Sequence, residues 1–234
     1  MISIDTVYQR VLAFANKEQR GYITPQEFNL FANQAQMDIF EQYFHDIDQY
    51  QRKPDNSTEY SNTVDLTDEK LSIFKYKGTA AATSTAGRFI LPSDIYRLGT
   101  LKYKETYVID EVKEDELIYI NSSALSRPTN TRPVYTRFRT TGADDIIQVY
   151  PNSIGQDVTL NYIKQPDPVY WGYAVINGNA LFDNTTAVHF KLHASEEKKI
   201  VLKILALAGI SIKDGALVQL AAQEEAKHVQ QEKS

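Results

Sequence analysis

Hydrophobic positions near the N-terminus recur at helical spacing. Val7, Val11 and Phe14 lie four and three residues apart, so they share one face of a helix. Asp5 is a suitable N-cap for this helix, and Gly21 suits the position that follows a C-cap. The chain is therefore predicted to begin with an amphipathic helix.

A second helix is predicted to begin at Thr24-Pro25-Gln26-Glu27. This sequence is a capping box, in which the Thr24 hydroxyl and the Glu27 carboxylate each accept a hydrogen bond from a backbone N–H. Pro25 takes the first helical position, where its missing N–H is no loss. The apolar stripe that follows is broad enough to need partners on more than one side. It comprises Phe28, Phe31, Ala35 and Ile39, widened by Phe40, Tyr43, Phe44 and Ile47.

Three aromatic residues of this stripe, Phe40, Tyr43 and Phe44, are predicted to contact a neighbouring subunit, because a helix's own core covers only one side of it. The polar segment that follows, Gln51 to Asn62, contains Pro54 and is read as a linker.

The middle of the chain alternates between β-branched or aromatic runs and turn residues, as in an antiparallel sandwich or barrel. The segment from Gly78 to Gly87 is nearly all Ala, Thr, Ser and Gly, and is predicted to be a mobile loop or the tip of a long hairpin. The predicted strands are Tyr107 to Val112, Leu117 to Ile120, Val134 to Arg139, Ile146 to Tyr150 and Val158 to Ile163.

Helical periodicity returns near the C-terminus. Val188, Phe190 and Leu192 alternate with polar residues and predict a last strand. Ser195 is predicted to cap a helix that ends at Gly209, and a final helix from Asp214 runs into a polar tail.

The predicted organisation is α+β. Helices in residues 1–52 and in residues 194–234 are expected to pack as one helical bundle, and this bundle flanks a central antiparallel β domain in residues 53–193.

Composition narrows the function. The 234 residues carry 25 basic and 30 acidic side chains, a net charge of −5, which argues against a protein that coats nucleic acid. The absence of cysteine excludes disulfides, thiolate metal sites and cysteine nucleophiles. The 15 tyrosines suit protein interfaces. No secretory signal or membrane span is recognised, so synthesis and assembly in the cytosol are expected.

Candidate metal sites are weak. On a helix, His189 and His193 with Glu196 and Glu197 nearby would suit zinc, but the predicted strand separates the two histidines by ~13 Å. A run of carboxylates is interrupted by Lys113 and lacks the glycine of a calcium loop, so it is read as a solvated hairpin face. The run consists of Asp110, Glu111, Glu114, Asp115 and Glu116.

No phosphate-binding loop or nucleophile elbow is present, and neither an enzyme activity nor a cofactor is predicted. Tyr170, Trp171 and Tyr173 suggest a carbohydrate-binding platform, although Trp171 as the anchor of a loop to the core is favoured. Four arginines form a candidate patch for a partner's carboxylates or for passing DNA, with exposed hairpin arginines the favoured alternative. They are Arg127, Arg132, Arg137 and Arg139.

Several stretches resemble structural proteins of tailed bacteriophages, including crAss-like phages. The layout, with helices at both ends and a β domain between, is similar to head–tail connector proteins of the adaptor or tail tubular A type. The resemblance covers about residues 1–226 and is carried by Leu91-Pro92-Ser93-Asp94-Ile95-Tyr96-Arg97-Leu98, by Arg127-Pro128-Thr129 through Tyr135, Ile147 through Pro151 and Tyr162 through Pro166, and by Phe190 through Glu197 running on to Ile210.

The resemblance implies a ring, commonly a dodecamer, that docks below the portal protein in the neck of the virion and extends the DNA channel to the tail. DNA then only passes through, no membrane is involved, and no catalytic residue is implied. The segment from Asp214 would contact the portal. Another neck or tail ring protein, or a carbohydrate-binding tail module, remains the alternative. The portal-docking residues implied are Leu217, Leu220, Glu224, Lys227 and Val229.

Overall fold

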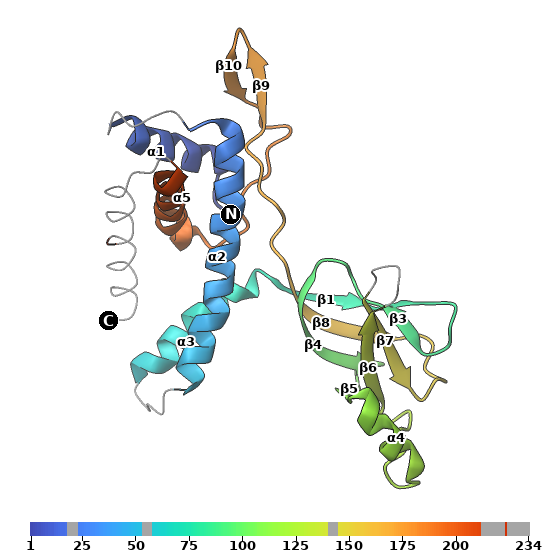
Figure 1. The fold of residues 1–234 in the computed structure, drawn as a ribbon. Coiled ribbons are helices and arrows are strands. Elements are labelled where there is room, and N and C mark those ends of the chain that lie inside the picture. The colour runs from blue at the N-terminus through green and yellow to red at the C-terminus, as the bar shows by residue number, and fades with distance from the viewer. Residues whose placement is uncertain (18–22, 53–57, 140–144, 212–222, 224–234) are drawn as a thin grey trace. The chain divides into compact units, whose positions relative to one another are not determined.

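The computed structural model describes residues 1–17, 23–52, 58–139, 145–211 and 223, and it divides into two compact units (Figure 1). The helical unit comprises Met1–Ile73 and Pro166–Ser234, and the β unit comprises Phe74–Gln165. The α+β class is confirmed. The β unit is shorter than the predicted range of residues 53–193, because the segments on both sides of it belong with the helices.

Helices from both ends of the chain build the helical unit. They are α1 (Ile4–Lys17), α2 (Pro25–Arg52), α3 (Thr58–Ser72) and α5 (Glu197–Ser211), with the short 3-10 helix η1 (Ala194–Glu196) before α5. Helix α5 packs against α1 and α2, and α3 packs against α2. Val7, Val11, Phe28, Ile200 and Ile204 are fully buried between these helices.

The capping box at the start of α2 forms as predicted. The Glu27 carboxylate accepts the Thr24 backbone N–H at 3.0 Å, and the Thr24 hydroxyl accepts the Glu27 N–H at 3.3 Å. The Thr24 hydroxyl also donates to the Glu27 carboxylate at 2.8 Å, and the hydrogen bonds that this carboxylate accepts from the Thr24 N–H and hydroxyl hold the pKa of Glu27 below its ordinary value. The predicted cap of α1 is wrong, because the helix begins at Ile4 and the Ser3 hydroxyl accepts the Thr6 N–H at 3.4 Å.

The broad aromatic stripe of α2 faces the protein's own interior. Phe40, Tyr43 and Phe44 are 0%, 3% and 8% exposed, and the rings of Phe40 and Phe44 meet edge to face at 5.1 Å. The chain itself therefore covers the three residues predicted to contact a neighbouring subunit, and in this conformation they offer no surface to one. The helical unit itself therefore supplies the partners on more than one side that the broad apolar stripe of α2 was predicted to need.

Two further expectations are corrected by helices. Part of the polar segment read as a linker belongs to α3, which is tied to the core by buried Leu71 and by an ion pair between Lys70 and Glu196 at 2.7 Å. The predicted strand Leu117 to Ile120 lies in α4 (Glu114–Ser122). Three carboxylates in the first turn of α4 interact favourably with the helix dipole, and only Leu117 is buried, so the β-branched residues do not decide the structure.

Within the described residues, eight strands of the β unit form one mostly antiparallel sheet in the order β1-β8-β4-β5-β6-β7-β3-β2, with β5 and β6 parallel. Only Ala80 separates β1 from β2 in the chain, so the sheet nearly closes into a barrel around Phe89, Leu101, Ile147 and Leu160. The strands are β1 (Lys75–Thr79), β2 (Ala81–Ala82), β3 (Arg88–Ile90), β4 (Ile95–Tyr103), β5 (Tyr107–Glu111), β6 (Val134–Arg139), β7 (Asp145–Tyr150) and β8 (Val158–Lys164).

The segment from Gly78 to Gly87 corresponds to the hairpin alternative of its prediction. It contains the end of β1, all of β2 and the turn to β3, where the Thr83 N–H donates to the Arg88 carbonyl at 2.9 Å. Gly87 has φ 78°, and a Cβ there would lie 2.8 Å from the Val149 carbonyl oxygen, so the turn requires glycine at this position.

An extended segment from Pro166 to Trp171 returns from the β unit and lies along α2. Asp167 is confined to extended backbone between Pro166 and Pro168. Asn33 of α2 pairs with Val169 as a strand would, because its Oδ1 accepts the Val169 N–H at 2.8 Å and its Nδ2 donates to the Val169 carbonyl at 2.9 Å.

Asn29 repeats this pairing, since its Nδ2 also donates to the Trp171 carbonyl at 3.4 Å, and Gln36 makes one of the two hydrogen bonds. Asn29 Oδ1 accepts the Trp171 N–H at 2.7 Å, and Gln36 Nε2 donates to the Asp167 carbonyl at 2.9 Å. One helical turn advances about 5–6 Å, and two residues of extended chain advance about 6.6 Å. The two repeats therefore match, and Asn29, Asn33 and Gln36 form an amide ladder for alternate residues of the segment.

Asn33→Ala should lower the free energy of unfolding of the helical unit by about 2 kcal/mol, because it leaves both the Val169 N–H and carbonyl without their partners. Trp171, the single tryptophan, lies beside the ladder, so urea unfolding followed by its fluorescence reports on this unit. Leu30→Ala, at an exposed position of the same helix, is the matched control and should change stability by less than about 0.5 kcal/mol. Equal stabilities of the two variants would contradict the role of the ladder.

Candidate functional site

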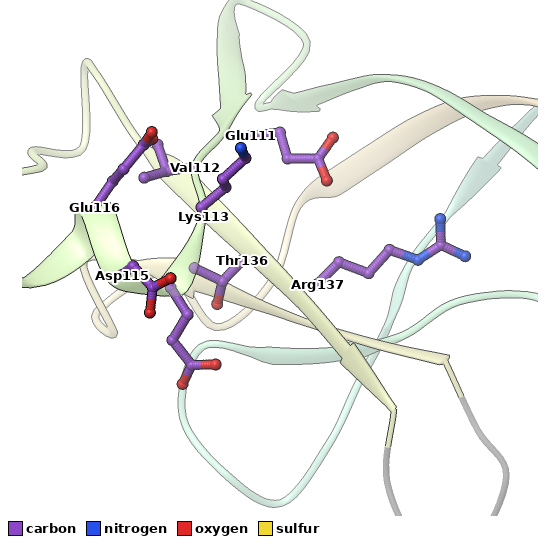
Figure 2. Close-up of a pocket in the computed structure, with 8 residues that line it drawn as sticks. Glu111, Val112, Lys113, Asp115, Glu116, Thr136 and Arg137 are labelled. Atoms are coloured by element: carbon purple, nitrogen blue, oxygen red, sulfur yellow. The ribbon is translucent and has the colours of Figure 1, made fainter.

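An acidic hollow of about 690 Å³ lies where β5 leads into α4, beside β6 (Figure 2). Arg137 extends away from the carboxylates of Asp115 and Glu116 on α4, so the side of the hollow formed by α4 is negatively charged. The hollow is lined by Glu111, Val112, Lys113, Glu114, Asp115, Glu116, Thr136 and Arg137.

Two groups at the hollow are held by neighbours. Arg137 Nη2 donates to Asp145 Oδ2 at 2.6 Å, and Glu111 Oε2 accepts the Tyr135 hydroxyl at 3.2 Å. Burial, reinforced by the negative charge of Glu111, raises the pKa of Tyr135 to about 12. Tyr135 is therefore a hydrogen-bond donor across the neutral range. Among the described residues, no group of three or more His, Asp or Glu side chains is arranged to hold a metal ion.

Helix α4 exposes apolar side chains next to the acidic hollow. Ile118 and Tyr119 are 71% and 77% exposed, and Leu125 beyond the helix is also exposed. Exposed apolar groups beside charged ones are characteristic of protein interaction sites. The α4 face is defined by Glu114, Asp115, Glu116, Ile118 and Tyr119.

A second hollow, of about 440 Å³, lies on the sheet at strands β1, β8 and β4. Strand β4 departs from regular register between Leu98 and Leu101, and Gly99 passes so close to β8 that a Cβ would lie 2.8 Å from the Asn161 carbonyl oxygen. Glycine at position 99 therefore allows the close approach of β4 to β8. The hollow is lined by Lys75, Tyr76, Lys77, Gly99, Thr100, Asn161, Tyr162 and Ile163.

Lys75 and Lys77 line this second hollow, and two further basic side chains lie on the same side of the sheet. The register pairs Lys75 and Arg97 with the same β8 residue, Ile163, so the three residues share one side of the sheet. Lys77 pairs with Asn161 and Lys102 with Thr159, and these two β8 residues lie on the same side as Ile163 by the two-residue alternation of a strand, so Lys75, Lys77, Arg97 and Lys102 share that side. We define these four residues as the basic face. The carboxylate of Glu105 pairs with Lys77 at 2.7 Å, which lowers the pKa of Glu105.

A second exposed apolar surface belongs to the helical unit. Strands β9 (Tyr173–Ile176) and β10 (Asn179–Phe182) form a hairpin that extends from the helices (Figure 1) and contains no charged residue. Its base is fixed because Tyr173 and Phe182 pack on Trp171. Their ring centroids lie 5.8 and 5.7 Å, respectively, from that of Trp171. The outer part of the hairpin exposes Val175, Ile176 and Leu181.

Trp171 does not form a carbohydrate platform. The side chain is 2% exposed, its ring lies 4.4 Å from that of Tyr8, and its indole N–H donates to Asp5 Oδ1 at 3.0 Å. Tyr170 is the exposed neighbour. The alternative in which Trp171 anchors a loop to the core is confirmed, and the platform alternative at this residue is wrong.

His189 and His193, the histidines weighed as zinc ligands, cap two different helices. His189 Nδ1 accepts the Ile4 N–H at the start of α1, and His193 Nδ1 accepts the Ser195 N–H at the start of η1, both at 3.3 Å. His193 thus takes the capping role predicted for Ser195. Around the histidines, only isolated bridges form at Val188 and Phe190, so the predicted last strand is wrong.

Three of the four arginines of the candidate patch interact with nearby groups of the same chain. Arg137 and Arg139 both pair with Asp145, and Arg127 donates to the Asn121 carbonyl at 3.4 Å. Helix α5 extends past Gly209 to Ser211. The residues implied in portal docking lie outside the described residues, as does Gly21. They are Leu217, Leu220, Glu224, Lys227 and Val229.

No protein-family model and no curated protein sequence matches the chain. In the part of the chain that the structure describes, every helix is too short or too polar to cross a lipid bilayer.

Trp171→Ala should lower the free energy of unfolding by about 3–5 kcal/mol, because it opens a cavity among Tyr8, Tyr173 and Phe182. Urea unfolding followed by circular dichroism measures the loss. Tyr170→Ala is the matched control and should cost less than about 1 kcal/mol, since this side chain is partly in solvent. A Trp171→Ala variant of unchanged stability would contradict the anchoring role.

Tyr135 should ionise near pH 12, and the alkaline absorbance difference between the wild-type chain and Tyr135→Phe measures this transition. A pKa raised by folding means that the folded state keeps its proton while the unfolded tyrosine ionises near pH 10. The wild-type chain should therefore lose stability relative to Tyr135→Phe as the pH rises from about 10 to 12. Glu111→Gln should bring the transition closer to pH 10, and an unshifted transition in that variant would contradict the contribution of Glu111.

Proposed function

We propose that this chain is a ring-forming head–tail connector of a tailed bacteriophage. It binds below the portal in the neck of the virion and extends the DNA channel towards the tail. The observation that carries the proposal is the exposure of apolar side chains on protruding elements of both units, at α4 and at the β9–β10 hairpin. A subunit with neighbours on several sides needs such surfaces.

The internal construction supports the same proposal. The base of the β9–β10 hairpin is anchored on Trp171, whose backbone is held by the amide ladder, so the hairpin is presented from a fixed support. Binding through preorganised elements loses little conformational entropy, which suits a permanent assembly. The sequence resemblance to phage connector proteins and the terminal helices that pack together add to this support.

The net charge of −5 suits the passage of DNA. A surface that neutralises many phosphates holds DNA through the release of counterions, whereas an acidic wall does not. In the proposed ring, DNA is therefore cargo in transit and not a specific ligand. Assembly would take place in the host cytoplasm, with the portal and other neck or tail proteins as partners.

Quantitative mass spectrometry of purified virions tests the proposal. The expected result is a copy number close to that of the portal, because subunits of stacked rings occur in matched numbers. A large excess over the portal would instead favour a repeated tail component. Absence of the chain from virions would reject the structural role.

The same measurement examines the proposed portal contact. A phage that encodes the chain without residues 214–234 should incorporate much less of it, if that segment docks on the portal. A matched variant with Leu30→Ala, an exposed substitution, should be incorporated normally. Normal incorporation of the truncated chain would contradict docking through this segment.

A further inference from the structure

The β unit carries two surfaces of opposite charge. On the α4 face, three carboxylates follow one another in the first turn, at Glu114, Asp115 and Glu116. Lys113 is the lysine that lines the adjacent hollow. The basic face brings together Lys75, Lys77, Arg97 and Lys102 on one side of strands β1 and β4, where Lys77 pairs with Glu105. The first surface is therefore net negative and the second net positive.

The two surfaces also differ in relief. Ile118 and Tyr119 protrude into solvent from α4, beside the carboxylates. Lys75 and Lys77 of the basic face line the hollow of about 440 Å³, and Ile163 contributes an apolar side chain to the same lining. A protruding aromatic or aliphatic side chain flanked by negative charge thus matches a recess flanked by positive charge.

We propose that copies of this chain associate head to tail through their β units, with the α4 face of one copy docked on the basic face of the next. This inference rests on the ring-forming function proposed above and names a surface through which the ring closes. Because the two surfaces are different patches of the same unit, the contact is heterologous, and its repetition produces a closed ring or an open filament.

A second copy fits these observations better than the other ligands that charge alone would admit. The described residues contain no cluster arranged for a metal ion, so the acidic side is not explained by a cation. Phosphates would satisfy the basic face but would leave the hollow beside Gly99 without an apolar occupant. The second copy supplies both the carboxylates and the protruding side chains.

Charge reversal on each face gives a direct test. Variant A is Asp115→Lys/Glu116→Lys, which makes both faces positive. Variant B is Lys75→Glu/Lys77→Glu, which makes both faces negative. In an equimolar mixture, the unchanged α4 face of variant B can bind the unchanged basic face of variant A, as in the wild type. The reversed α4 face of variant A is positive and the reversed basic face of variant B is negative, so these two faces also complement each other. Sedimentation velocity on the full chain, over a range of concentration and salt, measures the association.

The wild-type chain should self-associate, and the association should weaken as salt rises, because exposed charges are screened. Each variant alone should associate at least tenfold more weakly, and the mixture should regain the wild-type association. Recovery in the mixture requires both variants to be folded, so misfolding does not imitate it. Glu41→Lys/Asp48→Lys, at exposed positions of α2, is the matched control and should behave as the wild type.

The protruding side chain is tested separately. Tyr119→Ala removes an exposed ring, so it should leave the stability of the chain unchanged while weakening the association about tenfold or more. Leu30→Ala, exposed on α2, is its control and should not alter the association. Unchanged association in Tyr119→Ala would reject the insertion of this residue into the hollow.

Three results would overturn the inference as a whole. They are a wild-type chain that remains monomeric at all concentrations, reversed variants that associate like the wild type, and a mixture that regains nothing. Loss of binding to a duplex DNA fragment in variant B, with normal self-association, would assign the basic face to nucleic acid. A copy number equal to that of the portal together with any of these results would reject only this contact. Absence from virions with recovery in the mixture would reject only the connector.

Discussion

The hydrogen bonding of α2 to the returning chain is the interaction on which the rest of the helical unit depends. Asn29, Asn33 and Gln36 form hydrogen bonds to the backbone of an extended segment, as a neighbouring strand would in a sheet. They thereby supply partners for its backbone N–H and carbonyl groups where no sheet is present. The segment fixes Trp171, and Trp171 in turn supports Tyr8, Tyr173 and Phe182. One row of side-chain amides thereby positions α1, α2 and the β9–β10 hairpin.

Local signals in the sequence predicted the features that local physics decides. The capping box at Thr24 and Glu27 forms because its partners are three residues apart, and the β-branched runs at Val134 and Val158 form strands. Leu117 to Ile120 failed because the preceding carboxylates favour a helix N-terminus. Asn29 and Asn33 gave no signal, since their partners are 142 and 136 residues away in the chain.

The candidate surfaces show the same division between local and distant information. The carboxylates of α4 were visible as a run, yet their exposed apolar neighbours Ile118 and Tyr119 read as part of a strand. The basic face joins Lys75 to Arg97 only through β8, which lies far from both in the sequence. Conversely, the pattern of Phe40, Tyr43 and Phe44 predicted a partner outside the chain, but all three are buried, and both α3 and α5 pack against α2.

The β unit is inserted into the helical unit with both of its ends close together. Its first and last strands, β1 and β8, pair with each other, and the Lys164 N–H donates to the Phe74 carbonyl at 2.9 Å, so the unit leaves the helices and returns to them at one point. To the helical unit it is a loop whose ends are already held together, whatever its length. Such an insertion behaves as a cassette: the barrel can be enlarged, replaced or exchanged without redesign of the helices that carry it.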